Sequence, residues 1–246
     1  MGLGPGDSSH VTPAAKAALD QARHLIGYGP YVARVEARDD QIVHATDNRV
    51  ELDRATHALQ LAASGEAVAV VSSGDAGVFA MAAAVFEALE NTESDFDSVD
   101  VGVVPGITAM NAAAARLGAP LGHDFCAISL SDNLKPWDLV VRRVRAAAEA
   151  DFVMAFYNPI SKARPWQLGE ILDMLRGIHD PQTPVMFATA VSRSDEAIKI
   201  VALADAKAEM ADMRTLVIVG SSATRCIPRR GGDQWVYTPR SVAVSA

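Results

Sequence analysis

The sequence predicts an α/β protein that folds as two α/β domains. Runs of apolar and β-branched residues alternate along the chain with longer segments of helical spacing. Several of these runs end in loops rich in glycine and other small residues, which is typical of strands that lead into a ligand site. The alternation breaks once, at the polar and proline-bounded segment 119–137, and then resumes. We therefore expect an N-terminal domain at 1–118 and a C-terminal domain at 119–246.

The chain opens on the loop GLGPGD at residues 2–7. Its three glycines permit positive φ and let a ligand approach the backbone, while Pro5 stiffens the turn. A helix is expected behind the loop, with Thr12 as its N-cap, Pro13 at its first position and Gly27 as its end. No strand precedes the loop in the sequence. We interpret this as a strand that is missing ahead of the loop, or as a start that was assigned too late.

The remaining elements follow from the same periodicity. Arg49 to Ser64 carries apolar residues at helical spacing and stops at Gly65. In the first half we then expect a strand at 67–71, a helix at 77–90, a strand at 99–104 and a helix of small residues that ends near Gly118. In the second half we expect strands at 127–130, 152–157, 185–191 and 216–220, and helices at 138–150, 166–178 and 195–204.

Four segments share one glycine-rich or small-residue design. They are GLGPGD, VSSGDAGVF at 71–79, VPGITA at 104–109 and VIVGSSAT at 217–224. The last three follow apolar runs, and α/β proteins hold their ligands in loops at strand ends. We therefore expect the function to lie where these loops meet.

Composition and charge narrow the class of protein. With 246 residues, half of them apolar and 21% charged, the chain can bury a sizeable core. The net charge of −8 leaves no basic stripe for phosphate backbones, which argues against nucleic acid as a partner. The longest apolar stretch, 78–86, is far shorter than the ~20 residues of a membrane span, and no signal-peptide pattern opens the chain. We expect a cytoplasmic protein that does not contact membranes.

The cysteines and the known catalytic motifs exclude further classes. Cys126 and Cys226 lie far apart, without CxxC spacing or nearby histidines, so we interpret them as buried free thiols. No zinc-ligand spacing, Ser-His-Asp order or P-loop occurs in the sequence. This argues against metalloenzymes, hydrolases and kinases, and we expect no metal. The spacing of GLGPGD is not the dinucleotide fingerprint either, because that motif requires glycine where this chain has Asp7.

Two of the first-half loops carry candidate binding residues. Asp75 follows a strand and can accept two hydrogen bonds from a ribose diol or an ammonium, while Gly74 and Gly77 leave room for a flat ligand. An equally simple interpretation is that Asp75 caps the helix that follows. Thr108 and Ala109 lie beside the start of another helix and give a weaker signal.

The second half carries polar and basic candidates. Asn158 ends a strand and offers both a donor and an acceptor. Lys162, Arg164 and Arg193 are the cations nearest to the loop ends and could clamp a polycarboxylate, although each could equally be a solvated surface charge.

The segment between the halves carries candidates for acid–base chemistry. His123 and Asp124 are neighbours in sequence, and Ser129, Ser131 and Asp132 follow shortly after. Adjacent residues of an extended segment point to opposite faces, so a purely structural role is the alternative.

Taken together, these segments resemble one family, the tetrapyrrole methylases that use S-adenosylmethionine in cobalamin and sirohaem synthesis. The order of GLGPGD, SSGDAGVFAMA, VPGITA, a YNP segment and a final VGSS carries the resemblance over nearly the whole chain. Three longer strings are most similar to a member that methylates its substrate at C17 and contracts the ring. They lie at 27–32 (GYGPYV), 117–137 and 156–168 (FYNPISKARPWQL).

The resemblance implies two α/β domains with the active site in the cleft between them, a homodimer, and S-adenosylmethionine as methyl donor. It implies precorrin-3B or a similar tetrapyrrole as substrate, whose ring contraction requires proton removal from a hydroxyl. The donor-binding residues that it implies are Pro5, Ser73, Gly74, Asp75, Val78, Thr108, Ala109, Asn158, Ala188 and Ala190. We add Ser131, Lys162, Arg164 and Arg193 as candidates for substrate binding, and His123, Asp124, Ser129 and Asp132 as candidates for catalysis.

One position departs from the family pattern. Many relatives have Gly-Asp-Pro where this chain has Gly74-Asp75-Ala76, which makes the loop less rigid. Three alternatives stay open: action on another ring carbon, action on the cobalt-bearing substrate, and a nucleotide-binding module without catalysis.

Overall fold

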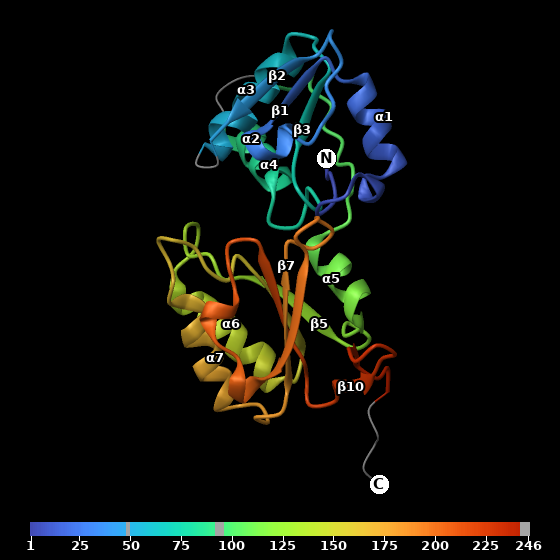
Figure 1. Cartoon of the computed structure of the whole chain (residues 1–246). Coiled ribbons are helices and arrows are strands. Elements are labelled where there is room, and N and C mark those ends of the chain that lie inside the picture. Colours follow the sequence, from blue (N-terminus) through green and yellow to red (C-terminus); the bar gives the residue numbers. More distant parts are fainter. Residues whose placement is uncertain (48–49, 92–95, 242–246) are drawn as a thin grey trace. The chain divides into compact units, whose positions relative to one another are not determined.

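The computed structural model describes residues 1–47, 50–91 and 96–241 (Figure 1). The chain forms two compact units, Met1–Ala109 and Met110–Ala246. Helix α5 (Ala109–Leu117), which the sequence assigned to the first domain, belongs to unit 2 except for its first residue. Among the described residues, no helix combines the length and the apolar character that a membrane crossing requires.

Unit 1 contains a parallel sheet with the strand order β2-β1-β3. The strands are β1 (His24–Tyr28), β2 (Ile42–Thr46) and β3 (Val68–Val71). The helices are α1 (Pro13–Gln21), α2 (Gly29–Val32), α3 (Glu51–Ala63) and α4 (Met81–Asn91), with a 3₁₀ turn at Ser8–His10. Helix α3 and strand β3 confirm the elements expected at 49–64 and 67–71, although Arg49 lies outside the described residues.

The start of helix α1 is confirmed and its end is wrong. Thr12 caps the helix, because its Oγ1 accepts the N–H of Ala15 at 3.1 Å. The helix ends at Gln21 instead of Gly27. Residues 24–28 form the central strand β1, which is buried along most of its length, and such a strand shows no alternation that would distinguish it from a buried helix.

The first residues of the chain, which begin the GLGPGD loop, make backbone hydrogen bonds to segments on both sides. The N–H of Leu3 donates to the Ser72 carbonyl at 2.9 Å, and the N–H of Ser72 donates to the Met1 carbonyl at 3.0 Å. On its other side, Gly2 donates to the Val104 carbonyl at 3.1 Å. The first four residues therefore lie between β3 and the segment around 104.

Two expectations about the end of unit 1 are wrong. Segment 99–104 forms no strand. Its Val104 carbonyl accepts one backbone hydrogen bond, from Gly2, and this single bond does not continue into a ladder. Helix α4 starts at Met81 instead of 77, because residues 72–80 are used by a long loop.

Unit 2 contains a five-stranded sheet with the order β5-β6-β9-β7-β8. Its strands are β5 (Phe125–Ser129), β6 (Val153–Tyr157), β7 (Pro184–Thr189), β8 (Ala197–Ala202) and β9 (Thr215–Val219). Helices α6 (Trp137–Glu149) and α7 (Gln167–Arg176) cover one face of this sheet (Figure 1). Their apolar side chains and those of the central strands form the core, which includes Val144, Phe156, Leu172 and Phe187.

The helix expected at 195–204 is wrong. Residues 197–202 form strand β8, whose six residues all pair with β7, and only a 3₁₀ turn (Leu203–Asp205) follows. Strand β8 lies at the edge of the sheet, where the mixed sequence AIKIVA fits an edge strand as well as a helix.

The C-terminal part adds elements that the periodicity did not predict. Strands β10 (Arg225–Pro228) and β11 (Gln234–Tyr237) form an antiparallel hairpin, which pairs with the short β4 (Gly118–Ala119). A further 3₁₀ turn, the third described, lies at Ala208–Met210. Cys226 on β10 is exposed, so its interpretation as a buried thiol is wrong, and Cys126 is half-buried.

Because of the direction of β9, the predicted loop VIVGSSAT at 217–224 does not lie with the loops that follow β6 and β7. β9 runs antiparallel to both β6 and β7, so the loop after it lies at the edge where those two strands begin. Gly220 accordingly donates to the Pro184 carbonyl at 2.9 Å, and the N–H of Ser222 donates to Asp151 Oδ1 at 2.8 Å. Within unit 2, the VIVGSSAT loop and the loop that carries Asn158 therefore lie at opposite ends of the strands.

Three histidines of unit 1 form a hydrogen-bonded row. Nδ1 of His24 on β1 lies 2.9 Å from Nε2 of His44 on β2, and Nδ1 of His44 lies 3.2 Å from Nε2 of His57 on α3. At the buried end of the row, His24 Nε2 lies 3.5 Å from Glu66 Oε2. Partial burial lowers the pKa of His44, and its neighbours His57 and His24 lower it further.

We predict that unit 1 loses stability as the pH falls below the ordinary pKa of histidine. In the unfolded chain, His44 takes up a proton near pH ~6.5, whereas in the folded chain it takes one up only at lower pH. The free energy of unfolding is therefore fully present above that pH and decreases below it. Thermal unfolding of wild type and His44→Gln between about pH 5.5 and 7.5 should show a smaller decrease in the variant. Equal pH dependence in both proteins would contradict the prediction.

Candidate functional site

Three of the predicted loops meet within unit 1, at a point where only glycine fits. Gly4 and Gly74 exchange backbone hydrogen bonds of 3.1 and 2.9 Å, and both have positive φ, +69° and +68°. A Cβ on Gly106 would lie 2.8 Å from the Gly2 Cα and closer still to the Gly74 carbonyl oxygen. The backbones of the loops at 2–7, 71–79 and 104–109 therefore pack directly on one another.

Asp75 joins the second of these loops to the third. Its Oδ1 accepts the N–H of Gly77 at 2.7 Å, and its Oδ2 accepts the N–H of Gly106 at 2.8 Å. Both carboxylate oxygens thus accept charge-assisted hydrogen bonds from backbone, one within the loop at 71–79 and one across to the loop at 104–109. Asp75 does not cap helix α4, which begins six residues later at Met81.

Arg34, which the sequence analysis did not identify, joins the first loop to the second. Its Nη2 donates to the carbonyl oxygens of Leu3, Gly4 and Gly6, each at 3.0 Å, and its Nη1 donates to Ser73 Oγ at 3.1 Å. A lone arginine far along the chain from both loops gives no sequence signal of this role. The role becomes clear only from the structure, in which the turn after α2 contacts the GLGPGD loop.

The other predicted donor residues of unit 1 lie on the same loops. Pro5 and Thr108 are buried, while Ser73, Val78 and Ala109 are half-buried. Phe79, next to Val78, has φ of +52° although its side chain is half exposed, which marks a strained turn.

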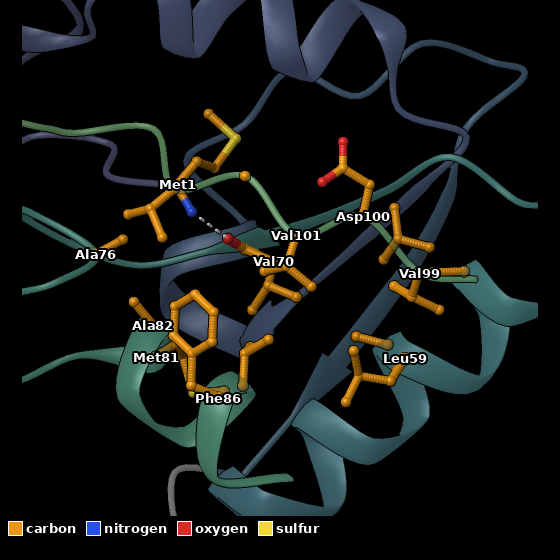
Figure 2. Close-up of a pocket in the computed structure, with 16 residues that line it drawn as sticks. Met1, Leu59, Val70, Ala76, Met81, Ala82, Phe86, Val99, Asp100 and Val101 are labelled. Carbon is orange, nitrogen blue, oxygen red and sulfur yellow. Dashed lines mark hydrogen bonds between the residues drawn. The ribbon is translucent and has the colours of Figure 1, made fainter. Parts of the chain in front are cut away.

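A cavity of about 120 Å³ also lies in unit 1, but the predicted donor residues do not line it. Figure 2 shows it among Met81 and Phe86 of α4, Leu59 of α3 and Val101, with the Met1 nitrogen donating to the Val70 carbonyl at 2.7 Å. Its walls are mainly apolar and lack converging polar groups, unlike most sites for small polar ligands. The loops are therefore the better candidate site of this unit.

In unit 2, the candidate residues gather at the edge where β5, β6 and β7 end. Ser129 ends β5, Asn158 follows β6 and Ala190 follows β7, and these three strands point the same way. The Asn158 side-chain amide donates to the buried Ser129 Oγ at 3.0 Å. Ala188, in contrast, lies inside β7 with no exposed surface.

The backbone at this edge is strained. Asn158, Ala190 and Ser192 have φ of +51°, +49° and +65°, in the left-handed region that favours glycine. Each such residue costs on the order of 1–3 kcal/mol, and such residues cluster at ligand sites. Ser192 also carries a buried Oγ that has no hydrogen-bond partner among the described residues.

Arg164 brings one substrate candidate together with one catalytic candidate. Its Nη1 donates to Ser131 Oγ at 2.8 Å, Asp132 Oδ1 at 3.0 Å and Asn133 Oδ1 at 2.6 Å. Loss of water around the Asp132 carboxyl would raise its pKa, but the hydrogen bond and the positive charge of Arg164 outweigh this and lower the pKa. Asp132 is therefore ionised at neutral pH.

The other two cations are not part of this cluster. Lys162 and Arg193 are both exposed, and the hydrogen bonds that hold Ser131, Asp132 and Asn133 together come from Arg164. Arg193 lies in the loop after β7, where its N–H donates to the Ala190 carbonyl at 3.0 Å.

His123 and Asp124 lie apart from the other catalytic candidates. His123 Nδ1 is 3.6 Å from Asp124 Oδ2, and both residues precede β5, whereas Ser129 ends that strand. At ~3.3 Å per residue, a five-residue strand separates the two groups by roughly 16 Å. The four residues therefore form two groups at opposite edges of the sheet.

Among the residues that the structure describes, no three histidine, cysteine or acidic side chains are placed to hold a metal ion. The fold and these loops define a class of α/β protein that presents backbone and small polar groups to an organic ligand. The chain belongs to the tetrapyrrole (corrin/porphyrin) methylases, whose family model matches residues 1–207.

Individual relatives agree with the family. The chain is 55% identical to a precorrin-3B C(17)-methyltransferase of Sinorhizobium sp. over 99% of this chain and 96% of that protein. The crystal structure of the methyltransferase CobJ matches with a TM-score of 0.91 and 57% identity, covering 97% of each chain. A uroporphyrin-III C-methyltransferase of Thermus thermophilus, solved in complex with S-adenosyl homocysteine, shares the fold at 22% identity and a TM-score of 0.64, covering 89% and 95% of the chains.

We predict that Gly106→Ala disrupts the loop contact of unit 1. The added methyl group would meet backbone atoms that cannot move independently, and overpacking of this kind costs about 1–3 kcal/mol. Gly102→Ala is the matched control, because a Cβ at that position of the same segment meets nothing within 4 Å. Denaturant unfolding should separate the two variants. Equal stability of both would show that the contact is not tight.

Proposed function

We propose that this chain transfers a methyl group from S-adenosylmethionine to C17 of precorrin-3B, with contraction of the ring to precorrin-4, in cobalamin biosynthesis. The observation that carries the proposal is the 55% identity, over almost the full length of both chains, to a relative named for this reaction. The close fold match to the methyltransferase CobJ supports it.

The residues of both units fit a methyl donor of this chemistry. In unit 1, glycine backbone and the Ser73 hydroxyl offer groups that suit an amino acid and a ribose, and Val78 and Ala109 add apolar surface. In unit 2, Asn158 and Ala190 lie on strained loops at one sheet edge. We propose that these residues bind the donor together with Pro5, Gly74, Asp75 and Thr108. Ala190, in the strained loop after β7, is preferred over Ala188, which lies inside that strand.

When bound, S-adenosylmethionine supplies an electrophilic methyl group on a sulfonium. The protein's part is to hold the reacting carbon of the substrate in line with that methyl group, at roughly 3–3.5 Å. Apolar side chains such as Val78 and Ala109 exclude water there, which favours the loss of charge as the methyl group is transferred. This positioning requires no covalent intermediate with the protein.

We propose that Arg164 and Ser131 bind a carboxylate of the substrate. The Arg164 guanidinium is held by Ser131, Asp132 and Asn133 through Nη1, while the described residues place no hydrogen-bond acceptor on Nη2. A carboxylate could bind to this free nitrogen through a charge-assisted hydrogen bond. Lys162 and Arg193 stay candidates as exposed cations in the neighbouring loops.

The four candidates for proton transfer lie in two groups, at opposite ends of strand β5. Asp132 and Ser129 lie at the edge that carries Asn158, whereas His123 and Asp124 lie at the opposite edge. We propose Asp132 as the base, because its carboxylate lies at this edge, and Ser129, which hydrogen-bonds to Asn158 and to the Ser131 N–H, as a nearby hydroxyl.

The reaction itself is tested by incubating the purified protein with precorrin-3B and a donor whose methyl group carries an isotope label. Mass spectrometry and NMR should locate one labelled methyl group at C17 of a contracted ring. A label at another carbon would assign a different member of the family. No transfer to precorrin-3B but transfer to its cobalt-bearing form would assign the cobalt pathway, and donor binding without any transfer would favour a binding module.

We predict that Asp75→Ala weakens the binding of S-adenosylhomocysteine about tenfold or more. The substitution removes the two hydrogen bonds that align the loops, and a hydrogen bond to a charged group is worth about 1.5–3 kcal/mol. Isothermal titration calorimetry measures the effect. Asp53→Asn, at an exposed position of α3, serves as control and should leave the dissociation constant unchanged. An unaltered constant in Asp75→Ala would refute the role of this residue.

We predict that Asp132→Asn lowers the rate of ring contraction by ~10² or more, the usual scale for a general base. His123→Ala is the matched comparison, because the sequence favours both residues and only the sheet separates them; it should retain most of its turnover. Single-turnover kinetics with saturating donor measure both variants. The reverse ranking would overturn this assignment.

The homodimer and the cytoplasmic location stay predictions from the family resemblance and from sequence composition. Light scattering of the purified protein tests the first.

A further inference from the structure

The Arg34 side chain makes long-range contacts that its sequence position does not suggest. It follows α2 in unit 1, and its guanidinium bonds to three carbonyl oxygens of the GLGPGD loop and to Ser73 on the loop after β3. The planar guanidinium has five N–H donors in a fixed geometry, which suits several acceptors at once. Lysine, with a single compact charge, cannot reproduce this arrangement.

These bonds fix peptide groups that would otherwise rotate. The carbonyls of Leu3, Gly4 and Gly6 all point toward Arg34, which sets the peptide planes on both sides of Pro5. Glycine loses more conformational freedom on ordering than any other residue. A loop that is already ordered avoids this cost when a ligand binds, and the affinity is correspondingly higher.

The same guanidinium sets the direction of the Ser73 hydroxyl. Because Ser73 Oγ accepts the N–H of Arg34 Nη1, its own proton must point to a different acceptor. Among the described residues, Ser73 Oγ makes only this hydrogen bond. Ser73 is half-buried on the loop that holds Gly74 and Asp75, so its O–H can donate to an oxygen or nitrogen of a ligand there.

The close packing of α2 on the sheet explains why Arg34 reaches the GLGPGD loop. A Cβ on Gly27 of β1 would lie 2.8 Å from a methyl carbon of Val32 and 2.7 Å from one of Val71, so glycine allows α2 to pack closely on β1 and β3. The turn that follows α2 is closed by the N–H of Arg34, which donates to the Tyr31 carbonyl at 3.1 Å. The arginine is thereby held next to residues 3–6.

We infer that Arg34 is a positioning residue for the methyl donor. It holds the GLGPGD loop in its binding conformation and turns the Ser73 hydroxyl toward a ligand acceptor, without touching the reacting atoms. This inference rests on the proposed function only for the identity of the ligand, S-adenosylmethionine. The ordering of the loop by Arg34 does not depend on that identity.

The test compares Arg34→Lys and Ser73→Ala with Arg38→Lys. Arg38 is the control, because it belongs to the same unit and forms an exposed ion pair with Asp40. Calorimetry with S-adenosylhomocysteine should show at least tenfold weaker binding in Arg34→Lys and a smaller loss in Ser73→Ala. The effects in the double variant should be less than additive, because both substitutions remove the same bond. The control should bind like wild type.

A kinetic readout separates positioning from a general loss of structure. In Arg34→Lys the KM for the methyl donor should rise, while the KM for the tetrapyrrole and the thermal midpoint stay near wild type. A lower midpoint with an unchanged donor KM would mean that Arg34 is only structural, and the inference would be wrong. If Arg34→Lys does not fold, Ser73→Ala decides: unchanged donor affinity in that variant would overturn the inference.

Amide hydrogen exchange of the ligand-free protein tests the inference independently of the proposed function. Faster exchange confined to residues 2–7 in Arg34→Lys would support the ordering role even if wild type failed to bind S-adenosylhomocysteine, which would refute the proposed function alone. Unchanged exchange in these residues would refute the ordering role.

Discussion

The close approach of three backbones at Gly2, Gly74 and Gly106 is the constraint on which the candidate site of unit 1 depends. No side chain separates these segments, so their spacing is set by van der Waals contact between main-chain atoms. Polar bonds then fix their orientation, through Asp75 on one side and Arg34 on the other. A negative and a positive side chain thus hold together three loops that would otherwise be flexible, because glycine is abundant in them.

The loops of unit 2 are held in place by different interactions from those of unit 1. Its candidate residues lie at the ends of regular strands, and behind β6 and β7 the chain turns through residues with positive φ. Side-chain bonds such as Asn158 to Ser129 and the Arg164 cluster connect neighbouring loops at one edge of the sheet. Glycine contacts organise the loops of unit 1, whereas strained non-glycine residues and charged hydrogen bonds organise those of unit 2.

Much of the fold could be predicted from the sequence, because local signals agreed with the tertiary structure. Thr12 and Pro13 marked a helix start, and Gly65 marked a helix end with φ of +90°. Failures arose where burial or pairing overruled local spacing, as in the central strand β1 and the edge strand β8. The reversed direction of β9 could not be predicted either, because periodicity does not contain strand orientation.

The site was predictable in part for similar reasons. Glycine and aspartate at strand ends are local patterns, and they correctly indicated where backbones meet in unit 1. The role of Arg34 could not be predicted from such patterns. Its partners in the GLGPGD loop lie about 30 residues away and are carbonyl groups, which every residue has. The separation of His123 from Asp132 likewise depends on the strand between them, which sequence proximity conceals.

The positive φ angles at Asn158, Ala190 and Ser192 have a consequence for the evolution and engineering of this protein. Glycine at any of these positions would relax the turn, and for Ala190 it would remove only one methyl group. A chain selected only for an unstrained backbone would carry glycine there. Ala190 and Ser192 are buried, so the packing around their side chains holds the backbone in a conformation that each residue alone would avoid.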